Sequence, residues 1–278
     1  MANDMALITF LPLGYFVLDS CGNKKLTALT FIMQNIAANL GGMLTPFGNP
    51  QNLYLYSYFN IAAGEFFKIM ALPFAVAFLL SLGVCLFVKP EKAEVLSAPK
   101  KTPPVWRIAL YSALFVLSVL IVFRVFPYYW GLLAVTAALL IFDFRAVLRV
   151  DYGLLFTFCA FFVFSGNMAR IPAVEEYLGG LVALDPLAFG VLSCQVISNV
   201  PSAVLLSKFT SDYANLLVAV NIGGLGTPIA SLASLITLNT YRRVCPGQTK
   251  KYIAKFLLLN FSFLAVLIGV GYLNVLIV

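Results

Sequence analysis

The sequence has no histidine, no cluster of cysteines and no phosphate-binding loop. Without histidine, a Ser-His-Asp triad and a histidine proton relay are excluded. The five cysteines are scattered singly, with no Cys-x-x-Cys pair, so a zinc site is excluded as well. The motif Gly-x-x-x-x-Gly-Lys-Ser/Thr is also missing, so the chain carries no nucleotide site of its own. Nothing in the sequence indicates an enzyme.

Charged residues are also scarce: they make up 10% of the 278 residues, whereas 62% are hydrophobic. A soluble domain carries about 25% charged and roughly 45–50% apolar residues. This apolar excess cannot be buried in one globular core, so lipid must contact much of the surface. The net charge of +7 comes from short clusters between apolar runs, which is typical of cytoplasmic loops and not of a nucleic-acid partner. We therefore expect an all-α polytopic protein in the lipid bilayer.

Two similar octets interrupt the apolar sequence, residues 39–46 (NLGGMLTP) and residues 221–228 (NIGGLGTP). Proline removes a backbone donor and disfavours the helical conformation at the preceding residue. Within lipid, such a break survives only where it is buried in protein or lines an aqueous cavity. Paired breaks in corresponding halves indicate a transporter's binding site. The sequence therefore predicts discontinuous helices over residues 26–59 and 213–239.

The remaining apolar runs complete two halves. Residues 1–88 are predicted to form a partial first repeat, with a hairpin's second arm, the broken helix and a spanning helix. Residues 89–107 form a polar linker that contains prolines, and residues 108–278 form the second repeat. In the second repeat we expect spanning helices over 108–126, 128–142 and 152–168, a re-entrant hairpin over 186–206, the second broken helix and a last span over 256–278.

Lysine and arginine predict the orientation. If the linker is cytoplasmic and the sides alternate from there, fourteen of the 18 basic residues lie inside. This is a strong positive-inside signal. The first break is then entered from the cytoplasm and the second from outside, so the halves form an inverted-topology repeat. A polar tip precedes each break, at Asn3 and Asp4 in the first half and at Ser198 and Asn199 in the second.

A broken helix offers free N–H groups at one half-helix end and free carbonyls at the other. Anions suit the N–H ends and cations the carbonyl ends. Asparagine and threonine oxygens are also ligands for a hard cation such as Na⁺, by analogy with Ca²⁺ and Mg²⁺. The simpler alternative is that Gly-Gly and Thr-Pro only kink helices or allow close packing. The polar tips and the opposite orientations favour a site.

Asp4 is the one acid expected near mid-membrane in the first half. An ionisable residue at that depth is a functional hypothesis by default, so Asp4 could carry a proton or bind a cation. The alternative is that a residue so close to the beginning of the chain is simply solvated. The sequence leaves both open.

The chain resembles the ion transporter superfamily, which includes ArsB-type arsenite permeases, NhaD-type antiporters, citrate transporters and divalent anion–sodium symporters. The matching motifs are residues 3–7 (NDMAL) with Pro12, residues 45–53 (TPFGNPQNL), residues 198–203 (SNVPSA) and residues 223–235. The resemblance implies inverted repeats whose hairpins and broken helices meet near mid-membrane, in homodimers, with no cofactor apart from a coupling ion. It places a Na⁺ near Asn3, Gly48 and Asn199. The residues that it assigns to ion and solute binding are Asn3, Asp4, Thr45, Gly48, Asn49, Pro50, Asn52, Ser198, Asn199, Thr227 and Ser231.

The chain departs from the superfamily pattern in three places. The first tip reads Asn-Asp, nearer to arsenite permeases than to the Ser-Asn-Thr of dicarboxylate carriers. The second break lacks the usual Pro-Asn, which counts against a second cation site. Superfamily members also have several helices before the first tip, so we expect the chain to be N-terminally truncated, with further spanning helices preceding Asn3 in the full-length product.

The leading hypothesis is a secondary active transporter for an inorganic or carboxylate anion, coupled to Na⁺ or H⁺, in the cell (inner) membrane of a prokaryote. The alternatives are an arsenite or antimonite efflux permease, a Na⁺/H⁺ antiporter of the same superfamily, a channel, or a non-transporting fragment. Saturable uptake driven by an ion gradient separates a transporter from a channel. A primary pump would require a separate ATPase partner.

The positive-inside count predicts that residues 89–107 and 240–255 face the cytoplasm and residues 170–184 face outside. In an otherwise cysteine-free chain, an impermeant thiol reagent added to intact cells should label Ala173→Cys and leave Ala98→Cys unlabelled. Labelling of Ala98→Cys from outside would contradict this topology.

Overall fold

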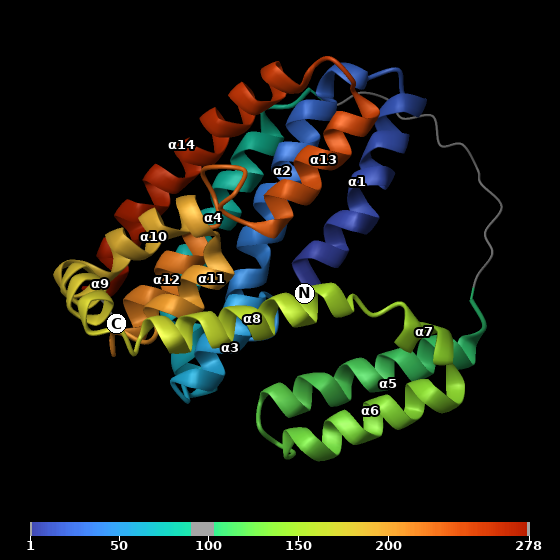
Figure 1. Ribbon diagram of the computed structural model, residues 1–278. Helices are drawn as coiled ribbons and strands as arrows, with labels where there is room; N and C mark the ends of the chain where they lie inside the picture. The colour runs from blue at the N-terminus through green and yellow to red at the C-terminus, as the bar shows by residue number, and fades with distance from the viewer. Residues whose placement is uncertain (1, 90–102, 277–278) are drawn as a thin grey trace. The chain divides into compact units, whose positions relative to one another are not determined.

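The computed structural model describes residues 2–89 and 103–276, and within these ranges it consists of α-helices and short 3-10 helices (Figure 1). The prediction of an all-α protein is confirmed. Most of the predicted linker at 89–107 lies outside the described residues. The chain divides into two compact units, one formed by residues 1–95 together with 161–278 and the other by residues 96–160.

The larger unit contains the two octets. Its first part holds the 3-10 helices η1 (Lys24–Leu26) and η2 (Gly42–Leu44) and the helices α1 (Ala2–Ser20), α2 (Thr27–Gly41), α3 (Pro50–Tyr58) and α4 (Ala63–Leu86). Its second part holds α9 (Pro172–Leu184), α10 (Pro186–Ile197), α11 (Asn199–Leu206), α12 (Tyr213–Ile222), α13 (Leu232–Val244) and α14 (Thr249–Val275). The smaller unit holds α5 (Val105–Val122), α6 (Tyr128–Phe142), α7 (Phe144–Leu148) and the first part of α8 (Tyr152–Met168).

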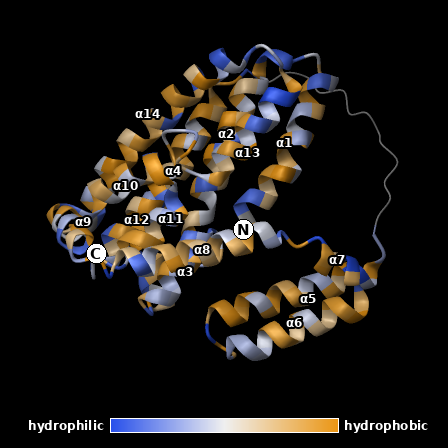
Figure 2. Ribbon diagram, viewed as in Figure 1, coloured by the Kyte–Doolittle hydropathy of each residue, from blue (hydrophilic) through white to orange (hydrophobic). Residues whose placement is uncertain are grey.

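Among the described residues, three helices are long and apolar enough to cross a membrane: α4, α5 and α14. A fourth crossing is formed if α8 and α9, which are bent by 99° at their junction, count as one broken span. Hydrophobic residues run along these helices, and hydrophilic residues gather at turns such as the connection from α1 to α2 (Figure 2). The chain is thus suited to cross the bilayer several times.

Helix α12 forms the centre of the larger unit. Every residue from Leu216 to Ile222 is buried, and α12 contacts α10, α11, α14, α3 and α4. A helix that is buried on every side and mostly apolar is stable only when it is surrounded by other helices. The second octet begins at the C-terminal end of α12, so this break is buried in protein. Within a membrane, interrupted backbone is tolerated only where it is buried in this way or lines an aqueous cavity.

The two interrupted helices pack crosswise. Helix α2, which precedes the first break, contacts α13, which follows the second break. Helix α12, which precedes the second break, contacts α3, which follows the first. As a result, two octets that are far apart in sequence lie in one part of the fold.

Close helix packing beside α12 predicts a stability effect. A Cβ added at Gly190 in α10 would lie 2.6 Å from the Cβ of Ala219 in α12, closer than atoms can pack. Overpacking of this kind costs about 1–3 kcal/mol. Gly190→Ala should therefore lower the apparent melting temperature of the detergent-purified protein.

The matched control is Gly83→Ala in α4, where an added Cβ would meet nothing within 4 Å. This variant should melt at or above the wild-type temperature, because alanine favours a helix over glycine. Equal melting of the two variants would show that α10 and α12 are not packed this closely.

Candidate ion and solute site at the helix breaks

The first break is a compact loop that folds back on the end of α2. Helix α2 ends at Gly41, η2 follows, and Thr45 and Asn49 adopt extended backbone before α3 begins at Pro50. A Cβ on Gly48 would lie 2.1 Å from the Gly42 carbonyl oxygen, and one on Gly42 would lie 2.0 Å from Asn49 Oδ1. Glycine is therefore required at both positions because the loop and the helix end approach so closely.

The second break is held by one glutamine, Gln195 of α10. Its Nε2 donates to the carbonyls of Gly223 and Leu225 at 3.0 Å each, and its Oε1 accepts from the Thr227 backbone N–H at 2.9 Å. Thr227 Oγ1 donates in return to the Gln195 carbonyl at 3.1 Å. Gly226 has φ of 104°, a left-handed conformation suited to glycine. The side chain of Gln195 thus replaces the hydrogen bonds that the helix loses here.

Buried asparagines connect the two breaks directly. Asn221, in the second octet, donates through Nδ2 to Asn52 Oδ1 at 2.6 Å and accepts from Asn49 Nδ2 at 3.2 Å. Asn49 Nδ2 also donates to the Asn39 carbonyl at 3.1 Å. Each of these four residues is at most 2% exposed. Both breaks therefore belong to one hydrogen-bonded network.

Asn52 also occupies the free carbonyls at the end of α2. Its Nδ2 lies 3.2 Å from the Gly42 oxygen, 3.3 Å from the Met43 oxygen and 3.2 Å from the Thr45 oxygen. These carbonyls carry the partial negative charge of the helix end. They are the groups to which a cation would be attracted, and in this structure an amide group meets them.

A second set of polar contacts links α2 with α13. Asn35 Nδ2 donates to Ser234 Oγ at 3.2 Å, and Ser234 Oγ shares a hydrogen bond of 2.8 Å with Ser231 Oγ. Asn39 Nδ2 lies one turn further along α2, 3.4 Å from Asn35 Oδ1. Ser231 is the N-cap of α13 and accepts from the Ser234 backbone N–H at 3.2 Å. The N-terminus of α13 is therefore already capped.

The tip between α10 and α11 reaches the second break. Ser198 turns the chain with φ of 74°, and the Asn199 N–H donates to the Ala230 carbonyl at 2.9 Å. A Cβ on Gly224 would lie 2.9 Å from Asn199 Nδ2 and 3.6 Å from Asn39 Oδ1. The structure thus brings Asn199 beside Gly224 of the second octet, and Asn39 of the first octet also reaches this glycine.

Asn3 and Asp4 lie in the first turn of α1, and both are 8% exposed. The Asp4 backbone N–H donates to Asn3 Oδ1 at 2.9 Å, whereas Asp4 Oδ1 is buried without a hydrogen-bond partner. Helix α1 packs against α2 and α13. In the described part of the chain, no hydrogen bond joins either residue to the breaks, so the first tip is buried but separate from the asparagine network.

The sequence-predicted site residues thus fall into three groups. The first break gathers Thr45, Gly48, Asn49, Pro50 and Asn52, and the second gathers Ser198, Asn199, Thr227 and Ser231 around its own loop. Asn3 and Asp4 form the third group. Five further polar residues take part in these contacts and were not among the site residues assigned from the sequence: Asn35, Asn39, Gln195, Asn221 and Ser234. Gln195 could have been noticed as a lone amide in an apolar hairpin arm.

The chemistry of the site is that of amides and hydroxyls. In the described residues, no three His, Cys, Asp or Glu side chains lie close enough together to hold a metal ion. Amide oxygens and backbone carbonyls suit a hard cation, and helix N-termini suit an anion. The arrangement is therefore suited to binding ions and small solutes.

Comparison with known proteins identifies the family. A family model described as citrate transporter matches residues 1–215. Uncharacterized transporter MJ0456 of Methanocaldococcus jannaschii is 32% identical over 262 residues, which cover 94% of this chain and 70% of that protein. Inner membrane protein YbiR of Escherichia coli is 34% identical over 244 residues, which cover 86% of this chain and 64% of that protein. Together with its apolar helices, these matches establish that the chain is an integral multi-pass membrane protein of the citrate transporter family, which consists of secondary transporters and not of enzymes.

Proposed function

We propose that this protein is a secondary active transporter for a small anion, inorganic or carboxylate, and that transport is coupled to Na⁺ or H⁺. The observation that carries the proposal is the buried network of Asn49, Asn52 and Asn221, which joins two helix breaks into one polar centre within an apolar fold. Buried polar groups in a membrane protein are costly and mark ion or solute pathways. Broken helices that meet in this way are the usual binding site of secondary transporters.

The proposal includes two inverted repeats, residues 1–88 and residues 108–278, joined by the linker at 89–107. It is supported by the shared octets, by the distribution of lysine and arginine, and by the crosswise packing of α2 with α13 and of α3 with α12. In such a repeat, each half supplies one broken helix to a common centre. A homodimer is expected from the superfamily resemblance.

The N-terminal end of α3 is the proposed anion position. Asn49 is its N-cap residue, but no side chain caps the helix there. The N–H groups of Gln51 and Asn52 in the first turn can therefore donate to an anion, and the helix dipole favours negative charge at this end. The N-terminus of α13, by contrast, is capped by Ser231. The solute is thus proposed to bind nearer the first break.

The coupling ion has two candidate positions. Asn49 Oδ1 is buried without a hydrogen-bond partner beside Gly42, and an amide oxygen of this kind can bind Na⁺ once Asn52 turns away from the nearby carbonyls. Asp4 Oδ1 is likewise buried without a partner, and a buried carboxyl group can carry a proton. The second position favours proton coupling, as in a Na⁺/H⁺ antiporter of the same superfamily.

Transport by reconstituted protein tests the proposal. Proteoliposomes are loaded so that an inward Na⁺ gradient or an inward proton gradient can be imposed separately, and uptake of labelled citrate, phosphate or arsenite is followed. We expect one of these solutes to enter with saturation kinetics only when one of the gradients is present. Flux that neither saturates nor responds to either gradient would indicate a channel.

Asn199 and Thr45 should matter for transport more than for folding. Loss of one hydrogen bond to a charged group costs about 1.5–3 kcal/mol, or roughly 10- to 150-fold in affinity. Asn199→Ala and Thr45→Val should therefore express normally but need that much more ion or solute for half-maximal uptake. The control is Ser112→Ala, on the exposed surface of α5. Unchanged half-saturation in both site variants would mean that the breaks are only structural kinks.

Gln195, by contrast, should matter for stability. Its amide group satisfies two carbonyls and one N–H of the second break, and each buried group left without a partner costs about 1–3 kcal/mol. Gln195→Ala should therefore lower the apparent melting temperature markedly, whereas Gln248→Ala at the exposed N-cap of α14 should not. A stable Gln195→Ala protein would show that Gln195 does not hold this loop.

A further inference from the structure

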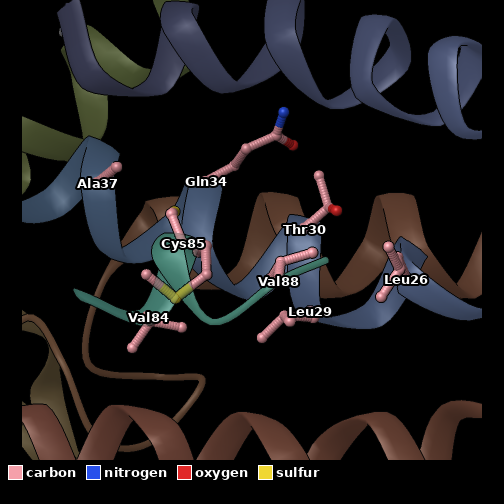
Figure 3. Close-up of a pocket in the computed structure, with 9 residues that line it drawn as sticks. Leu26, Leu29, Thr30, Gln34, Ala37, Val84, Cys85 and Val88 are labelled. Carbon is pink, nitrogen blue, oxygen red and sulfur yellow. The ribbon is translucent and has the colours of Figure 1, made fainter. Parts of the chain in front are cut away.

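A pocket lies between α2 and the C-terminal end of α4, away from the asparagine network. Its volume is about 440 Å³, which is within the usual range for small-molecule sites. Leu26 and residues of α2 form one wall, and Val84, Cys85 and Val88 form the other (Figure 3). The apolar residues that line it are Leu26, Leu29, Met33, Ala37, Val84 and Val88.

The pocket is elongated along the helix. Leu26, the N-cap residue of α2, and Ala37 within α2 are eleven residues apart, which is a rise of about 16 Å. One leaflet of the hydrocarbon core is about 15 Å thick. A second, smaller hollow of about 80 Å³ shares Ala37 and continues between α2 and α4 to Gly41 and Phe74. The groove therefore has the length and the apolar lining of an acyl chain that extends from the surface toward mid-membrane.

Two lysines lie at the end of this groove formed by Leu26 and Val88. Exposed Lys25 immediately precedes Leu26, and exposed Lys89 immediately follows Val88. Lys24, by contrast, pairs with Asp19 at 2.6 Å. Both exposed lysines belong to the side that the distribution of lysine and arginine assigns to the cytoplasm. Basic residues at this position attract anionic headgroups of the inner leaflet.

Two polar side chains, Thr30 and Gln34, also line the groove. Thr30 lies one turn further along the helix than Leu26, and its hydroxyl can donate to an ester carbonyl of a bound lipid. Gln34 reaches across to α1, where its Nε2 donates to the Phe10 carbonyl at 3.0 Å (Figure 3). A Cβ on Gly14 would lie 2.7 Å from that Nε2, so glycine leaves room for this contact. Gln34 therefore helps to join α1 to the pocket wall.

We propose that this groove is a binding site for an anionic phospholipid of the cytoplasmic leaflet. One acyl chain occupies the apolar groove between α2 and α4, and the headgroup phosphate lies between Lys25 and Lys89. The lipid thereby fills the space beside α2, the helix that carries Asn35 and Asn39 of the candidate transport site.

The test is lipid binding by the detergent-purified 278-residue protein, with bound molecules counted by native mass spectrometry. Phosphatidylglycerol and phosphatidylcholine with the same acyl chains are titrated in parallel. Each lysine near an anionic surface contributes roughly fivefold in affinity. Wild-type protein should therefore bind one phosphatidylglycerol about 25-fold more tightly than phosphatidylcholine, and Lys25→Gln with Lys89→Gln should remove that preference. Val84→Phe should prevent this lipid from binding.

Two controls match these changes in charge and size. Lys250→Gln with Lys251→Gln removes two exposed lysines from the same predicted side of the membrane, and Val266→Phe enlarges an exposed residue of α14. Both control variants should still bind one phosphatidylglycerol tightly and should still prefer it to phosphatidylcholine. The proposal is overturned if the two lipids bind equally to wild-type protein, or if either pocket variant binds phosphatidylglycerol as its control does.

Discussion

The fold depends on one constraint: backbone groups freed by a helix break inside a membrane must find partners within the protein. At the first break the partner is Asn52, whose amide meets three carbonyls at the end of α2. At the second break it is Gln195, which meets two carbonyls and one N–H group. One amide side chain at each break replaces the lost helical hydrogen bonds. This explains how two unwound segments persist in a chain that is otherwise largely apolar.

The same amides connect the two breaks. Because Asn221 bonds to both Asn49 and Asn52, a movement at one break changes the hydrogen bonds available to the other. A coupled pair of breaks is what cotransport needs, since an ion and a solute must affect each other's binding. Under the proposed function, an ion that drew Asn52 away from the α2 carbonyls would also alter the contact of Asn52 with Asn221.

Much of the fold could be predicted from sequence because it depends on local chemistry. Apolar length predicted the helices over 152–168 and 128–142, and Gly-Gly with Thr-Pro predicted both breaks. The crosswise packing of α2 with α13 and of α3 with α12 could not be predicted, because it joins residues about 170–200 positions apart and no local pattern encodes such contacts. For the same reason Asn35, Asn39, Gln195, Asn221 and Ser234 were not assigned to the site, although Asn39 and Asn221 belong to the octets. Asn3 and Asp4 were grouped with the breaks by resemblance, and the hydrogen bonds of the described residues leave them apart.

The most direct test of the central claim is a double-mutant cycle across the breaks, measured on the half-saturation concentration for transport. Asn52→Ala, Asn221→Ala and the double variant are compared with wild-type protein in proteoliposomes. Each change in half-saturation concentration is converted to a free energy of binding. If both breaks form one site, the free-energy change of the double variant should differ from the sum of the two single changes by at least about 0.5 kcal/mol, as is found for residues in contact. Single losses that simply add, or variants that transport like wild type, would show that the breaks do not act as one site.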